Sequence, residues 1–75
     1  MELAALQVAL GQLPDEQREA VLLVGAEGYS YEEAAEICGT KIGTIKSRVN
    51  RARRRLVELL GYEHARDVGP DGVGV

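Results

Sequence analysis

The chain has 75 residues, of which 45% are hydrophobic and 28% charged, and its formal net charge is −3. A chain of this length forms one small domain with a thin core, because it buries only about 60% of its unfolded surface. Its apolar runs are too short to span a bilayer, no signal peptide is visible, and a single cysteine excludes an internal disulfide, so a cytoplasmic protein is expected.

The first helix is expected over about residues 2–12. Leucines recur there every three or four residues, which is the spacing of one face of a helix. These are Leu3, Leu6, Leu10 and Leu13. A second helix is expected from Pro14 to about Ala26, because proline suits a first helical turn and the acids after it suit the positive end of a helix. Its core candidates are Val21, Leu22 and Val24.

A third, short helix is expected over residues 31–37. Ser30 is followed three residues later by Glu33, which is the pattern of a capping box. Gly39 is placed to take the left-handed conformation that commonly follows a helix end. The residues expected to pack inward are Ala34, Ala35 and Ile37.

The fourth helix is expected from about Ile42 to Leu60, with Gly61 beyond its end. At 100° per residue, its apolar residues fall within one arc of about 100°. They are Ile42, Ile45, Val49, Ala52, Leu56, Leu59 and Leu60. The opposite face carries Gly43, Lys46, Ser47, Asn50, Arg51 and Arg54, and the flanks carry Arg48, Arg53 and Arg55. The helix is therefore expected to dock by an apolar seam and to present a polar, basic face.

Positive charge is segregated along the chain. From Cys38 to Val57 there are seven basic residues and no acidic one, whereas the remainder has two basic and twelve acidic residues. A basic stripe along one element is typical of nucleic-acid binding. A solvated helix face is the alternative, but such faces usually mix both signs. A membrane-surface helix would show a similar wheel, but the apolar arc has no Trp or Phe and is needed for the core.

A short helix, a turn with glycine and a longer helix predict a helix-turn-helix, whose second helix lies in the major groove of double-stranded DNA. The residues expected to contact base edges are Lys46, Ser47, Asn50 and Arg51. Phosphate contacts are expected at the start of this helix, where small residues and free N–H groups allow close approach, and from the flanking basic residues. The residues expected to contact phosphates are Tyr31, Lys41, Gly43, Thr44, Arg48, Arg53, Arg54 and Arg55.

Several segments together resemble region 4 of bacterial sigma factors of the extracytoplasmic-function type. The matching pieces are Leu13-Pro14 with Arg18, the segment SYEEAA at residues 30–35, and GTIKSR at residues 43–48 followed by Arg51-Ala52-Arg53. The segment EICG at residues 36–39 and the pair Val49-Asn50 are similar to the general-stress-response subgroup. The resemblance covers residues 3–61. It implies a four-helix domain that recognises the promoter −35 element, docks on the flap of RNA polymerase and is sequestered by an anti-sigma protein.

Two features depart from the family pattern. Lys41 stands where Ser or Pro is frequent before the recognition helix, so either the N-cap shifts to Thr40 or the helix start is weakly capped. Region 2, which binds the −10 element, is absent from this chain, so the chain is either a fragment of a longer sigma factor or a stand-alone module.

The sequence thus predicts an all-α fold, a small four-helix domain over residues 1–61 with a C-terminal helix-turn-helix, followed by a flexible tail over residues 62–75. A sigma-like decoy that binds an anti-sigma protein and not DNA is the alternative function, but a decoy would be expected to lose the polar residues of the fourth helix. A helix-turn-helix of the response-regulator type would lack the Leu13-Pro14 start. Cys38 is expected to be a small core residue, and His64 has no second metal ligand nearby. No nucleophile–base pair is present, so no enzyme activity, cofactor or small-molecule substrate is expected.

Overall fold

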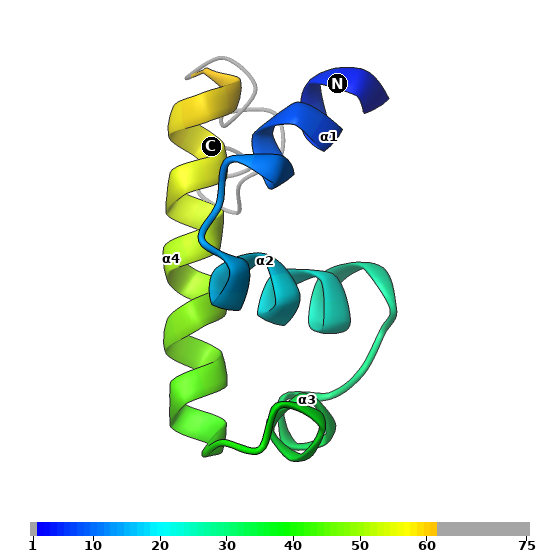
Figure 1. The fold of residues 1–75 in the computed structure, drawn as a ribbon, viewed down its shortest axis with the longest axis vertical. Helices are drawn as coiled ribbons and strands as arrows, with labels where there is room; N and C mark the ends of the chain where they lie inside the picture. Colours follow the sequence, from blue (N-terminus) through cyan, green and yellow to red (C-terminus); the bar gives the residue numbers. More distant parts are fainter. Residues whose placement is uncertain (1, 62–75) are drawn as a thin grey trace, which may run out of the picture.

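A computed structural model describes residues 2–61 of the chain. Within this range the protein is all-helical: α1 (Leu3–Gly11), α2 (Asp15–Val21) continued by a π-helical segment η1 (Leu22–Ala26), α3 (Tyr31–Cys38) and α4 (Ile42–Leu60). Helix α4 runs the length of the domain, and α1, α2 and α3 lie along one side of it (Figure 1). The all-α fold with four helices is confirmed. The flexible tail predicted over residues 62–75 lies outside the described residues.

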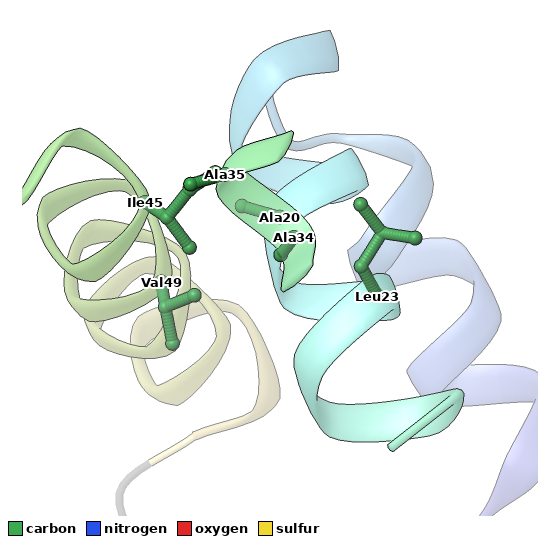
Figure 2. Close-up of a cluster of buried hydrophobic side chains, with 6 residues drawn as sticks. All are labelled: Ala20, Leu23, Ala34, Ala35, Ile45 and Val49. Atoms are coloured by element: carbon green, nitrogen blue, oxygen red, sulfur yellow. The ribbon is translucent and has the colours of Figure 1, made fainter. Parts of the chain in front are cut away.

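The core lies where α2, η1 and α3 meet α4. Its buried cluster is Ala20, Leu23, Ala34, Ala35, Ile45 and Val49. Figure 2 shows Ile45 and Val49 directed from α4 toward the alanines of the other helices. Three of the six side chains are alanines, and small side chains allow helix backbones to approach closely. Such a core excludes water mainly by close helix packing rather than by large side chains.

Helix α1 packs against α4. Ala9 and Leu13 are buried, and Leu6 and Leu10 are half-buried. Leu3 belongs to the same leucine stripe but is 67% exposed. Figure 1 shows the reason, because the N-terminal end of α1 points away from α4. The leucine stripe therefore predicted which face of α1 turns toward the domain, but the N-terminal part of that face is exposed.

The second helix extends to Ala26, as predicted, but its last five residues form a π-helix. The N–H group of Glu27 donates to the carbonyl oxygen of Leu22 over 2.9 Å, five residues back. Of the core residues expected in this segment, Val24 packs against the buried cluster, whereas Val21 and Leu22 are not among its members. Val21, Leu22 and Val24 are half-buried, whereas the fully packed residues are Ala20 and Leu23. Selecting by hydrophobicity missed Ala20, which is buried because it lies at a close approach of helices.

Helix α3 has well-defined ends. Ser30 Oγ accepts a hydrogen bond from the N–H group of Glu33 over 3.0 Å, and Glu33 Oε1 accepts from the N–H group of Ser30 over 2.9 Å. This is the predicted capping box. At the other end Gly39 has a φ of 67°, and the N–H group of Thr40 donates to the carbonyl of Ala35 over 2.9 Å. This closure is a Schellman motif, which directs the chain sharply into α4.

One residue of α3 lies differently from the prediction. Ile37 is 51% exposed, and Cys38 packs against the core instead. At 100° per residue, Tyr31, Ala34, Ala35 and Cys38 share one arc of the helix, and Ile37 lies outside it. The short helix offered too few residues for its period to be read before its neighbours were known.

Candidate nucleic-acid interface

Helix α4 separates an apolar seam from an exposed basic face, as its wheel predicted. Ile45, Val49 and Ala52 have no exposed surface. Leu56, Leu59 and Leu60 are half-buried along the same seam. Ile42 was expected in this seam but is 38% exposed, because it is the first residue of the helix and no preceding turn covers it. The burial pattern fixes the rotation of α4, and therefore decides which side chains face solvent.

The start of α4 is open. Its N-cap is Lys41, which makes no side-chain capping hydrogen bond, so of the two alternatives expected from the sequence the weak cap is confirmed. The first turn contains no acidic residue. Gly43 is exposed, and a Cβ at that position would meet no atom within 4 Å. The first N–H groups of a helix have no partner inside the helix and favour anions. The N–H groups at this end of α4 can therefore donate hydrogen bonds to a phosphate oxygen at close range.

The predicted contact residues differ in exposure along α4. Those with exposed side chains or backbone are Lys41, Gly43, Lys46, Asn50, Arg51, Arg53, Arg54 and Arg55. Those that are half-buried are Tyr31, Thr44, Ser47 and Arg48. All except Tyr31 belong to α4 or its N-cap. One straight helix therefore supplies nearly the whole candidate interface, over a length of about four turns.

The basic residues of α4 do not all have the same surroundings. Arg48 lies 3.7 Å from the carboxylate of Glu16 at the start of α2, and its side chain is 23% exposed. Arg55 lies 3.0 Å from Glu58, one turn further along α4. Each such pair on a protein surface contributes at most about 1 kcal/mol. A phosphate would have to compete with these carboxylates for Arg48 and Arg55. In the described residues, Arg51, Arg53 and Arg54 have no such acidic neighbour within 4.0 Å.

Lys46 lies toward α3. Its ammonium group is 5.9 Å from the centre of the Tyr31 ring, a distance typical of a cation–π contact. Tyr31 is half-buried, packs against the core cluster and is the first residue of α3. The sequence predicted contacts for both residues separately but could not show that they lie together.

A surface hollow of about 410 Å³ lies beside the contact between α4 and the start of α2. It is lined by Pro14, Glu16, Gln17, Gly43, Thr44, Ser47, Arg48 and Arg51. A shallower hollow next to it shares Gln17 and Arg51 and reaches Arg54. Gln17 therefore lies at the edge of the candidate interface, although it was not among the contact residues predicted from the sequence. Nothing in the local sequence marks Gln17, because its closeness to Arg51 arises only when α2 packs on α4.

Arg18 has a structural role. Its guanidinium donates to the carbonyl oxygen of Leu13 over 3.1 Å and pairs with Asp15. These contacts hold the link between α1 and α2, and with it the edge of the hollow beside α4. Leu13, Pro14 and Arg18 thus act as one local unit.

The described residues offer little else that could carry chemistry. No group of three His, Cys, Asp or Glu residues in that range could hold a metal ion. Burial, followed by the neighbouring Glu19, raises the pKa of the Cys38 thiol above its ordinary value. The thiol is therefore neutral at physiological pH, which agrees with its expected packing role. None of the helices described is long and apolar enough to cross a membrane.

Comparison with known proteins identifies the family. Residues 3–56, which include all of α2, η1 and α3 and most of α4, match the family described as "Sigma-70, region 4". The chain belongs to the sigma-70 region 4 family. The α3–α4 unit, in which the predicted helix-turn-helix falls, therefore belongs to a region 4 domain.

Relatives place the chain among sigma factors of the extracytoplasmic-function type. It is 58% identical over 71 residues to the sigma factor EcfG of Rhodopseudomonas palustris, covering 95% of this chain and 39% of that protein. It is 53% identical over 58 residues to SigM of Mycobacterium tuberculosis, covering 77% of this chain and 30% of that protein. The resemblance to this type of sigma factor, stated from the motifs, is confirmed. The chain spans about two fifths or less of the length of these relatives.

A solved structure also matches the fold. It is that of the sigma factor RpoE of Bartonella quintana, determined in complex with the anti-sigma factor NepR. The TM-score is 0.77 at 60% sequence identity, and the match covers 80% of this chain and 38% of that chain. The arrangement of helices is therefore that of a sigma factor domain.

Proposed function

We propose that this domain recognises the −35 element of promoter DNA, as region 4 of a bacterial sigma factor that directs RNA polymerase to stress promoters. The observation that carries the proposal is the exposed face of α4. An acidic chain presents its positive charge on one helix, and that helix is the second of a helix-turn-helix. Family membership supports the same conclusion.

The geometry of α4 suits the major groove, which is wide enough to admit one helix. Ser47, Asn50 and Arg51 project from the first half of α4, where a recognition helix meets base edges. Arginine pairs in bidentate fashion with guanine, asparagine pairs with adenine, and serine accepts either partner. These three residues therefore read bases in the proposed complex.

The remaining polar residues suit the DNA backbone. Gly43 and Thr44 present the open start of α4 to a phosphate, and Lys41 stands beside them. Arg53 and Arg54 lie further along the helix, where it leaves the groove. Arg48 and Arg55 are held near Glu16 and Glu58, and they contribute by exchanging these carboxylates for phosphates. Contacts of this kind position the protein without reading sequence.

Two protein partners belong to the proposal. Region 4 domains work on RNA polymerase, where they dock on the flap, and the solved relative from Bartonella quintana was determined with an anti-sigma factor. We infer that both kinds of partner bind this domain and that it acts in the cytoplasm, where polymerase and promoter DNA meet. Sigma factors direct the polymerase and perform no chemical step themselves, so the domain acts by binding alone.

A matched pair of arginines tests base reading. Arg51 and Arg54 are both exposed and lie one turn apart on α4. Arg51→Ala is expected to cost about 1–3 kcal/mol on a duplex selected by the parent domain from a randomised pool, and to flatten discrimination at one base position. Arg54→Ala is expected to weaken all duplexes alike and to reduce the salt slope by about one unit.

Fluorescence anisotropy against single-base variants of the selected duplex measures both effects. If Arg54→Ala changed base preference while Arg51→Ala lowered affinity uniformly, the assigned roles would be reversed. If neither variant affected DNA binding and both weakened the complex with NepR of Bartonella quintana, the decoy function would replace DNA recognition.

A further inference from the structure

We propose that Tyr31 is a positioning residue of this interface, whose ring holds Lys46 at the α3 edge of α4 so that Lys46 contacts a DNA phosphate and does not read a base. The inference rests on the proposed DNA-binding function. It departs from the expectation drawn from sequence, which assigned Lys46 to base contact. It also replaces the phosphate contact expected of the Tyr31 hydroxyl with a role of the Tyr31 ring, which acts only through Lys46.

The position of Tyr31 is fixed from two sides. The capping box of Ser30 and Glu33 defines the start of α3, so that Tyr31 is the first residue of the helix. The ring packs against the buried cluster that α2, η1, α3 and α4 share. Such a ring keeps its place on the surface whether or not DNA is bound. It is therefore a suitable platform for a longer, more flexible side chain.

Lys46 is the flexible member of the pair. A lysine side chain on a surface loses considerable rotamer freedom when it is held in one direction. The ammonium group of Lys46 lies 5.9 Å from the centre of the Tyr31 ring, and the negative face of the ring attracts it. This contact biases Lys46 toward α3 and away from the side of α4 that faces α2, where Ser47 and Arg51 line the hollow.

The direction of the bias determines what Lys46 meets. In a helix-turn-helix the second helix enters the groove, and the first crosses the sugar–phosphate backbone. A lysine held over the first residue of α3 therefore lies at the rim of the groove, next to phosphates. A lysine is a point charge with rotatable donors, which suits a phosphate better than the fixed geometry of a base edge. The structure thus separates Lys46 from the base-reading residues, although all share one helix.

The pair itself can be tested without DNA. The aromatic ring of Tyr31 should shift the NMR signals of the Lys46 ε-methylene protons upfield in the free 75-residue chain. The shift should persist in Tyr31→Phe, which keeps the ring, and should vanish in Tyr31→Leu. Equal shifts in the parent chain and in Tyr31→Leu would overturn the inference.

The functional test uses the selected duplex and a scrambled duplex of the same composition. Tyr31→Leu is expected to weaken both complexes about two- to fivefold, because binding must then restrict a Lys46 side chain that the ring no longer holds in place. Tyr31→Phe is expected to bind like the parent. Lys46→Met keeps the aliphatic stem without the charge, and it should lower the salt slope by about one unit while leaving the ranking of single-base variants unchanged.

Because Tyr31 also packs against the core, a double-mutant cycle separates positioning from stability. In the Lys46→Met background, Tyr31→Leu should cause no further loss of DNA affinity at a temperature where thermal melts show both variants folded. An undiminished loss there would show a purely structural role and overturn the inference. So would a flattened base preference in Lys46→Met, or a loss in Tyr31→Phe equal to that in Tyr31→Leu. Absence of DNA binding by the parent chain would instead refute the proposed function itself.

Discussion

Two isoleucines of α4 provide a sharp test of the packing described above. Ile42 and Ile45 lie three residues apart, and the helical wheel places both on the apolar seam. In the structure Ile45 has no exposed surface, whereas Ile42 is 38% exposed. Replacing each by alanine makes the same chemical change on the same helix. The difference between the two variants therefore measures burial alone, apart from small differences in helix propensity.

The expected magnitudes follow from that difference. Removing a fully buried isoleucine down to alanine typically costs about 2–5 kcal/mol, which includes the cavity left behind. Three of the five other buried members of the Ile45 cluster are alanines, which are too short to fill the cavity by a change of rotamer, so we expect about 3 kcal/mol. A domain of about 60 residues is stable by roughly 3–9 kcal/mol, so Ile45→Ala removes a large part of the total. Ile42→Ala should cost less than about 1 kcal/mol, because part of the side chain is already in water.

Thermal melts followed by far-UV circular dichroism measure both variants. In a domain of this size each kcal/mol shifts the Tm by about 4–8 °C. Ile45→Ala is thus expected to lower the Tm by about 12–24 °C, and Ile42→Ala by less than about 8 °C. Urea denaturation should show the same order with unchanged slopes. Equal losses in the two variants would refute the rotation assigned to α4, and with it the set of residues placed on the DNA-facing side.

Three further predictions concern charge, capping and the thiol. The logarithm of DNA affinity should fall against the logarithm of salt with a slope of about −4 to −5, because about four to six basic side chains of α4 and its N-cap meet phosphates; a slope near zero would contradict DNA binding. Ser30→Ala should cost about 1 kcal/mol by removing the cap of α3, whereas Ser47→Ala on α4, which makes no capping hydrogen bond, should change stability by less than about half of that. Since burial and Glu19 raise the pKa of the Cys38 thiol, iodoacetamide should alkylate Cys38 in the folded chain more slowly than in the urea-unfolded chain at the same pH. Faster alkylation in the folded chain would contradict the raised thiol pKa. Because the unfolded chain loses the thiol proton at a lower pH than the folded chain, the free energy of unfolding should fall as the pH rises above the ordinary thiol pKa.

Local signals predicted the helix boundaries well. Ser30 with Glu33, Gly39, and Gly61 after a long amphipathic run act within a few residues of themselves, so the ends of α3 and α4 follow from the sequence. The seam of α4 was predictable because nineteen residues repeat one period five times. The short helix α3 gave too few repeats, which is why Ile37 was misplaced, whereas Ala20 was missed because selection by hydrophobicity passes over small residues.

The sequence by itself determined the helical fold, the rotation of α4 and the separation of its basic face, because each depends on the order of residues along one helix. The family, too, was evident from motifs within short segments. Only the tertiary structure decided which basic side chains have neighbours. The contact of Lys46 with Tyr31, the ion pair of Arg48 with Glu16 and the place of Gln17 beside Arg51 join residues at least fifteen positions apart. Such contacts depend on how α2 and α3 pack against α4, and helix periodicity carries no information about the relative placement of separate helices.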